Sequence, residues 1–182
     1  MLDEILLEVE DKMDKSLESL RKNLLTIRTG RANPAMLNHV QCEYYGSMTP
    51  INQMASISVV EGRQLVIKPY DRSIVKAMVQ ALNAANLGFP VQNEGDLIRI
   101  VIPPLTQDLR KSLSKDAQKM GENAKVVIRN IRREGNDQIK KDKSMPEDTK
   151  KDGNNEIQKL TDEYIKKIDA MVKEKTNDIM EI

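Results

Sequence analysis

Small and apolar residues recur at alternating steps of four and three along a largely polar stretch from Thr106 to about Lys143. This spacing is typical of a helix that packs along other helices through one inner stripe. At 1.5 Å per residue, such a helix would be about 57 Å long. We predict that its inner stripe consists of Leu113, Ala117, Met120, Ala124, Val127 and Ile131.

Two other segments carry a helical pattern. Residues 1–29 place an apolar residue every three or four positions, and Gly30, suited to a C-terminal cap, is followed by Pro34, which cannot continue a helix. The third helix is expected to begin near Pro146, and Gly153 should weaken its first turns by about 1 kcal/mol. Its predicted inner face contains Ile157, Leu160, Tyr164, Ile168, Met171 and Ile179. Residues 1–29 and 106–182 together therefore predict a three-helix bundle.

The segment between the first two helices has a different composition. Residues 31–104 include 11 charged residues among 74, against 46 among the other 108. Alternating or short apolar runs near residues 40–44, 57–59, 65–67 and 91–102 predict strands, and Asp71 suits the N-terminal cap of one helix. The predicted fold class is α+β, an elongated three-helix bundle with an inserted small α/β domain. The two tethers, at residues 29–33 and 102–105, are predicted hinges.

The outer surface of the long helix is basic. Within that helix, neither Arg129 nor Arg132 has a carboxylate three or four residues away, and only Arg133 has one, Asp137. A solvated charged surface is the common explanation of a basic run, whereas the planar guanidinium of arginine suits phosphate. Both explanations remain open. At 100° per residue, the side opposite the stripe contains Lys125, Arg129, Arg132, Arg133, Asn136 and Lys140.

Composition limits the kinds of polyanion that would fit. With 29 basic and 28 acidic residues the net charge is +1, so binding would depend on the distribution of charge rather than on its total. The chain has no tryptophan, one phenylalanine and four tyrosines, which argues against a platform that stacks unpaired bases. Folded or double-helical RNA is therefore a better candidate than an extended single strand.

No catalytic centre can be assembled from the sequence. Cys42 and His39 are the only cysteine and histidine, and His39 is expected in a strand, so neither a metal site nor a nucleophile and base is predicted. No glycine is followed by lysine, which excludes a phosphate-binding loop, and no Gly-Gly-Gln occurs. We expect no enzymatic activity and no cofactor. The single cysteine, and the lack of a signal-peptide pattern or a long apolar run, favour a cytoplasmic protein without a membrane span.

Short motifs along the whole chain resemble those of the bacterial ribosome recycling factor family. They are residues 29–34, 44–46, 49–50, 103–106, 129–133 and 158–162. The resemblance implies an L-shaped protein whose helical bundle binds large-subunit rRNA on the ribosome after termination. It also implies that elongation factor G with GTP acts on the bound factor, so that the subunits separate and the mRNA is released.

The resemblance further implies which residues make the contacts, and we expect the protein to act as a monomer. The rRNA-binding set comprises Arg28, Arg129, Arg132 and Arg133, with Lys125 on the same surface, and the hinge set comprises Gly30, Arg31, Pro103 and Pro104. The alternative is a cytosolic helical adaptor or chaperone whose basic surface binds an acidic protein. Ribonuclease treatment separates the two, because it should abolish only binding that depends on RNA.

Overall fold

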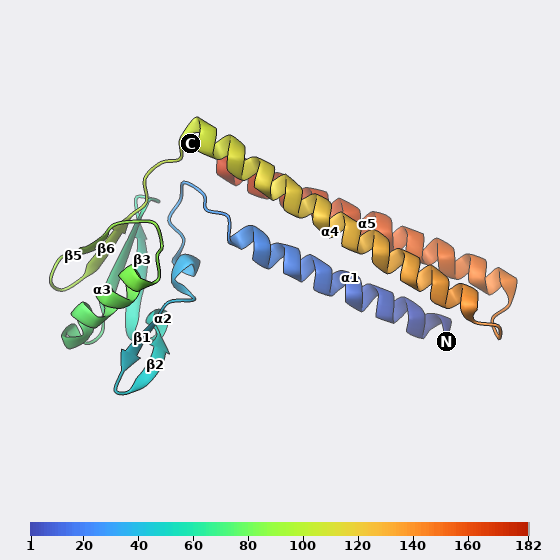
Figure 1. Cartoon of the computed structure of the whole chain (residues 1–182), viewed down its shortest axis with the longest axis horizontal. Helices are drawn as coiled ribbons and strands as arrows, with labels where there is room; N and C mark the ends of the chain where they lie inside the picture. Colours follow the sequence, from blue (N-terminus) through green and yellow to red (C-terminus); the bar gives the residue numbers. More distant parts are fainter. Residues whose placement is uncertain (182) are drawn as a thin grey trace. The chain divides into compact units, whose positions relative to one another are not determined.

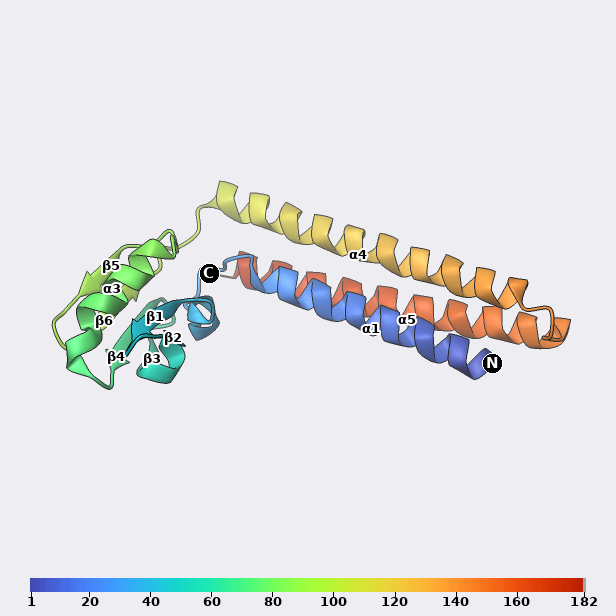
Figure 2. The ribbon, with the colours of Figure 1, turned by 60° about the horizontal axis from the view of Figure 1, so that its bottom comes forward.

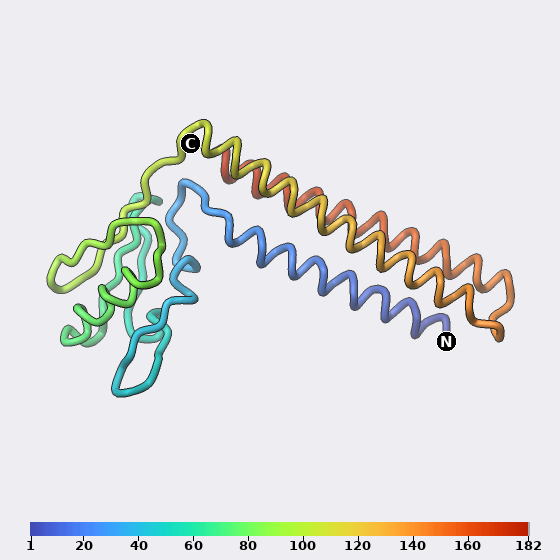
Figure 3. Tube along the Cα trace, viewed as in Figure 1, coloured from blue at the N-terminus to red at the C-terminus, as the bar shows by residue number. Residues whose placement is uncertain are grey.

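A computed structural model describes residues 1–181 and divides into two compact units. Met1–Arg28 and the chain from Thr106 onward form the first unit, and Thr29–Leu105 form the second. The first unit contains three long helices, α1 (Leu2–Leu25), α4 (Gln107–Lys141) and α5 (Glu147–Met180). They lie side by side in both ribbon views (Figure 1, Figure 2), and the Cα trace shows the blue N-terminal helix running beside the yellow-to-red C-terminal pair (Figure 3). The predicted fold class, a three-helix bundle with an inserted α/β domain, is confirmed.

Local signals set the ends of these helices. Thr106 is the N-cap of α4, and its Oγ1 accepts a hydrogen bond at 3.2 Å from the backbone N–H three residues later. Pro146 precedes the first residue of α5, as predicted. The end of α1 was predicted too late, because its C-cap is Thr26, in the right-handed helical conformation. Gly30 is therefore not the cap, and the predicted capping role is wrong.

The buried face of α4 differs from the prediction most clearly at Val127. Ile128 is fully buried, whereas Val127 is 45% exposed. Leu113 and Met120 lie half-buried at the edge of this face. The buried face also includes Gly121 and Gly135. With these two glycines counted, buried residues recur every three or four positions along the helix. Besides Arg110 near the start of the helix, the buried residues of α4 are Ala117, Gly121, Ala124, Ile128, Ile131, Gly135 and Ile139.

Glycines allow the three helices to approach closely. A Cβ atom at Gly135 of α4 would lie 2.7 Å from Val9 Cγ2 of α1 and 2.9 Å from Ile157 Cδ1 of α5. A Cβ atom at Gly153 of α5 would lie 2.6 Å from Leu2 Cδ1 of α1. Because carbon atoms in favourable contact are about 3.5–4.0 Å apart, any side chain at these positions would displace a neighbour. Gly153, expected from the sequence only to weaken α5, therefore also occupies a packing position.

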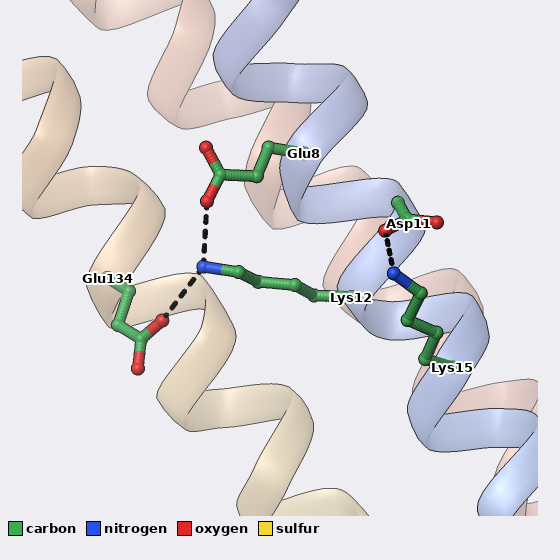
Figure 4. A network of polar contacts seen from close by, with 5 residues as sticks. All are labelled: Glu8, Asp11, Lys12, Lys15 and Glu134. Carbon is green, nitrogen blue, oxygen red and sulfur yellow. Dashed lines mark hydrogen bonds and ion pairs between the residues drawn. The ribbon is translucent and has the colours of Figure 1, made fainter.

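Polar contacts connect α1 to the other two helices. Tyr164 of α5 is buried, and its hydroxyl donates a hydrogen bond to Asp14 Oδ1 of α1. Figure 4 shows Lys12 of α1 between Glu8, at 2.8 Å, and Glu134 of α4, at 3.4 Å. Ion pairs that are as solvent-accessible as these contribute little to stability. The buried tyrosine is therefore the more important of the two connections.

The second unit is built on antiparallel strands. A four-stranded sheet has the order β3 (Ala55–Val60), β4 (Gln64–Pro69), β6 (Ile98–Val101) and β5 (Val91–Asn93). Strands β1 (Gln41–Tyr44) and β2 (Ser47–Pro50) form a separate hairpin. The helical elements are η1 (Pro34–Leu37), α2 (Ile51–Met54), η2 (Arg72–Ile74) and α3 (Val75–Ala84). The core contains sheet residues such as Leu65 and Ile100 together with Met78 and Leu82 of α3.

Two details of this unit were not predicted correctly. His39 lies exposed in a turn that follows η1, not in a strand. Strand β2 was missed, although Tyr45 and Gly46, with φ of 49° and 80°, form the tight turn that pairs it with β1. Asp71 does act as an N-cap, since its Oδ1 accepts a hydrogen bond at 2.9 Å from the backbone N of Ser73. In the part of the chain that the structure describes, no helix is long and apolar enough to cross a membrane.

Candidate nucleic-acid interface

Three arginines of α4 lie outside its buried face. Arg129 and Arg133 are exposed and Arg132 is half-buried. Within residues 1–181, the side chains of Arg129 and Arg133 make no hydrogen bond or ion pair, and the possible pair between Arg133 and Asp137 one turn later is not formed. Their guanidinium groups therefore keep all their N–H donors for a ligand, and the planar arrangement of these donors matches phosphate.

Arg132 contacts the neighbouring helix through a neutral group. Its Nη1 donates a hydrogen bond at 3.2 Å to Oε1 of Gln158 on α5. The Nε2 of Gln158 in turn donates at 3.0 Å to Oδ1 of Asp162. No carboxylate of the described residues lies within ion-pair distance of Arg132, so its positive charge is not neutralised.

Lys125 is held differently from the arginines. Its Nζ lies 2.6 Å from Asp169 Oδ1 of α5 and 3.2 Å from Glu122 Oε1 of α4, and its side chain is only 16% exposed. The hydrogen bond to Asp169 is the largest cause of a raised pKa of Lys125, to which the hydrogen bond to Glu122 adds. The ammonium group is therefore charged but already paired with two carboxylates. It is therefore less available to a phosphate than the exposed Arg129 and Arg133.

Arg28 lies beyond the end of α1, three residues after Leu25, and is half-buried. It belongs to the first unit, as do Lys125 and the three arginines of α4. The five predicted contact residues therefore come from one folded unit, although Arg28 is far from the others in the sequence.

The predicted hinge residues lie in the two linkers. Pro103 and Pro104 are exposed, and Gly30 and Arg31 lie in irregular backbone after α1. Within the second unit, both linkers bind the turn between β3 and β4. The N–H of Ala32 donates to the Gly62 carbonyl and that of Ile102 to the Arg63 carbonyl, each at 2.8 Å. Each linker is therefore hydrogen-bonded to the turn between β3 and β4, one at Ala32 and the other at Ile102.

The described residues contain no other arrangement with an evident chemical role. No group of three or more histidine, cysteine, aspartate or glutamate side chains is placed to bind a metal among residues 1–181. Gln158, Asp162 and Asp169, which determine how two of the cations on α4 are held, were not among the predicted site residues. Gln158 and Asp162 lie four apart, the spacing of a pair on one helix face, but their relation to α4 requires the packing of the bundle.

Comparison with known proteins identifies relatives along the whole chain. The family model described as ribosome recycling factor matches residues 20–180. The ribosome-recycling factor of Clostridium tetani is 49% identical over 183 residues, and that of Clostridium acetobutylicum is 47% identical over 185 residues. Each alignment covers 100% of this chain and 100% of the relative.

Two solved structures give the same result. One is a solution structure of the ribosome recycling factor, with a TM-score of 0.84 and 36% identity, covering 100% of this chain and 98% of that one. The other comes from models of the T. thermophilus ribosome recycling factor and the E. coli elongation factor G bound to the E. coli post-termination complex. It has a TM-score of 0.65 and 42% identity and covers 98% of both chains.

Proposed function

The chain belongs to the ribosome recycling factor family, and from this premise we propose that it binds the post-termination ribosome and promotes separation of the subunits and release of the mRNA. Members of this family are translation factors without enzymatic activity. We therefore assign GTP hydrolysis to a partner, elongation factor G, which is bound together with the factor in one of the structures that this chain resembles. The protein is proposed to act as a monomer in the cytoplasm.

The arginine surface of α4 is the observation that carries this proposal. Arg129 and Arg133 are exposed without ion pairs among the described residues, and Arg132 is held by a neutral amide. Such groups suit the phosphates of large-subunit rRNA, and Arg28 is proposed to join them. Lys125 would contribute only if phosphate displaced Asp169 or Glu122, so we propose a smaller role for it. Phosphate contacts of this kind position a protein on folded RNA without reading its sequence.

Relative movement of the two units is the second part of the proposal. The linkers are hydrogen-bonded within the second unit at Ala32 and Ile102, and residues 29–31 and 103–105 connect these points to the first unit. These segments contain Gly30, Arg31, Pro103 and Pro104, the proposed hinge residues. Spin labels on the two units should report a distribution of distances in solution, and a single narrow distance would argue against a hinge.

Co-sedimentation with ribosomes tests the function directly. Vacant and post-termination ribosomes would be incubated with the protein, with and without elongation factor G and GTP, and binding and subunit release measured. We expect saturable binding that ribonuclease abolishes, followed by subunit separation only when both the partner and GTP are present. Failure to bind ribosomes, or binding without any separation, would contradict the proposal.

A matched pair of variants tests the binding surface. Arg132→Ala should weaken ribosome binding without changing the helical content, because it removes a phosphate ligand from the surface of the bundle. Arg21→Ala removes an exposed arginine of α1 that pairs with Glu18 at 3.2 Å and should leave binding unchanged. Each phosphate contact contributes a slope of about −0.7 to −0.9 to log K against log salt, so Arg132→Ala should also flatten this dependence. Equal binding by both variants at several salt concentrations would contradict the assigned surface.

A further inference from the structure

Two residues of α5 complete the arginine surface of α4. Gln158 accepts a hydrogen bond at 3.2 Å from Arg132 Nη1 and donates one at 3.0 Å to Asp162 Oδ1. Asp162, Gln158 and Arg132 therefore form one chain of hydrogen bonds that crosses from α5 to α4. The first two lie at the ends of the motif of residues 158–162, whose role the proposed function does not explain.

Asp162 determines which way the amide of Gln158 points. A carboxylate can only accept hydrogen bonds, so the Nε2 end of the amide must face Asp162. The amide oxygen is then directed at Arg132, which can only donate. In the reverse orientation, the amide oxygen would meet the carboxylate and its NH2 group would meet the guanidinium, and neither hydrogen bond would form. Asp162 thus fixes the acceptor end of Gln158 toward Arg132.

Arg132 differs from Lys125 because its hydrogen-bond acceptor, the amide oxygen of Gln158, belongs to an uncharged group. Lys125 is paired directly with two carboxylates, which cancel its charge toward any ligand. Gln158 instead occupies a donor at Nη1 and leaves the charge and the remaining N–H groups of the guanidinium available. A long side chain that is already oriented loses less conformational entropy when it binds. The amide can therefore orient Arg132 without neutralising it.

We propose that Gln158 is a positioning residue for phosphate binding by Arg132, and that Asp162 holds it in the required orientation. The inference rests on the proposed function, since it assumes that Arg132 contacts rRNA. Gln158 itself does not contact the phosphate. Its contribution to ribosome binding passes through the guanidinium group of Arg132.

A double-mutant cycle on ribosome binding tests this role. Gln158→Ala should weaken ribosome binding about three- to tenfold, the range of one ordinary hydrogen bond. In an Arg132→Ala background the same change should have no further effect, because the group that it positions is absent. Asn155→Ala removes an exposed amide one turn earlier on α5 and should leave binding unchanged. Equal weakening by Gln158→Ala in both backgrounds would show that Gln158 acts independently of Arg132 and would overturn the inference.

Gln158→Glu provides a second readout that a purely structural role would not change. The new carboxylate would form an ion pair with Arg132, so ribosome binding should fall more than in Gln158→Ala. The slope of log K against log salt should become shallower by about 0.7 to 0.9, the contribution of one phosphate. Unchanged binding by Gln158→Glu would overturn the inference.

The outcomes also separate this inference from the proposed function. If Arg132→Ala weakens binding but Gln158→Ala does not, only the positioning role fails. If the unmodified protein does not bind ribosomes, the proposed function fails, and the positioning role fails with it.

Discussion

Replacing Gly135 with alanine tests how closely the three helices of the bundle approach one another. Gly135 is buried on α4, and a Cβ atom there would lie 2.7 Å from Val9 Cγ2 and 2.9 Å from Ile157 Cδ1. Both neighbours are buried, and Val9 Cγ2 is positioned by a χ1 angle that has few alternatives in a helix. The added methyl group would therefore force α4 away from α1 and α5, or force Val9 and Ile157 out of their rotamers.

Two opposing effects set the size of the change. Alanine is favoured over glycine inside a helix by about 0.8–1.0 kcal/mol. Overpacking a well-filled core costs about 1–3 kcal/mol. With the overpacking cost taken as about 2 kcal/mol, we expect Gly135→Ala to lower the free energy of unfolding by about 1 kcal/mol. The sign of the change is informative, because helix propensity alone predicts that alanine would raise the free energy of unfolding.

Urea unfolding followed by far-ultraviolet circular dichroism measures this change, since most of the helix lies in the bundle. Asn130→Ala, at an exposed position of the same helix, is the matched control and should be stabilising by a few tenths of a kcal/mol. Val9→Ala would make room for the new methyl group, so the double variant should be less destabilised than the sum of the two single changes. A stabilisation of about 1 kcal/mol by Gly135→Ala, with no coupling to Val9, would refute the close approach of the helices.

Three other changes have expected outcomes. Tyr164→Phe should cost about 1 kcal/mol near neutral pH, by loss of the hydrogen bond to Asp14. Burial first, and then that hydrogen bond, raise the pKa of Tyr164, so the folded state holds the proton more tightly. Stability should therefore fall as the pH rises above about 10, and the difference between the two proteins in urea unfolding should shrink there. Thr106→Ala should lower the stability of the bundle by about 1 kcal/mol in the same assay, through loss of the N-cap of α4. Lys125→Met should change the salt dependence of ribosome binding less than Arg129→Ala does, because Lys125 is already paired with carboxylates.

Signals within one element allowed the helices to be predicted closely. Thr106 and Pro146 mark the starts of α4 and α5 through the chemistry of their own side chains, without reference to the rest of the fold. The end of α1 was less well marked. Gly30 is a suitable cap residue, but the helix ends earlier, where Thr26 Oγ1 donates a hydrogen bond at 2.6 Å to the Asn23 carbonyl. A glycine that suits a C-terminal cap therefore does not exclude that the helix ends at an earlier residue.

The inner face of α4 was partly misassigned because a hydrophobic pattern does not count glycine. Gly121 is buried where α4 meets α5, and Gly135 where α4 meets both α1 and α5. With these glycines included, the buried stripe passes through Ile128 rather than Val127. A search for small residues, as well as apolar ones, at steps of four and three would have found this face. Glycine is needed at these positions because neighbouring helices lie close to α4. This closeness cannot be inferred from the sequence of α4 alone.

The candidate site was predicted as a set of cations, and the groups that hold them were missed. Arg129 and Arg132 could be found because the absence of carboxylates three or four residues away is a property of one helix. The pairing of Lys125 with Asp169, and of Arg132 with Gln158, depends on the register between α4 and α5. That register results from packing of the buried faces, so it cannot be predicted from the sequence of either helix alone.

A net charge of +1 is compatible with polyanion binding because charge is unevenly distributed in the bundle: α4 carries ten basic and five acidic residues, whereas α1 carries four basic and seven acidic ones. Glu134, which reaches Lys12 of α1, lies five residues from Arg129, or about 140° around α4, so Arg129 faces away from α1. Packed helix axes are about 8–10 Å apart, and charges are screened over about 8 Å at physiological ionic strength. A phosphate at the arginine surface would therefore interact with the uncompensated cations of α4 and only weakly with the carboxylates of α1. Those carboxylates are Asp3, Glu4, Glu8, Glu10, Asp11, Asp14 and Glu18. The distribution of charge between two helices, rather than its sum over the chain, decides whether the protein attracts RNA.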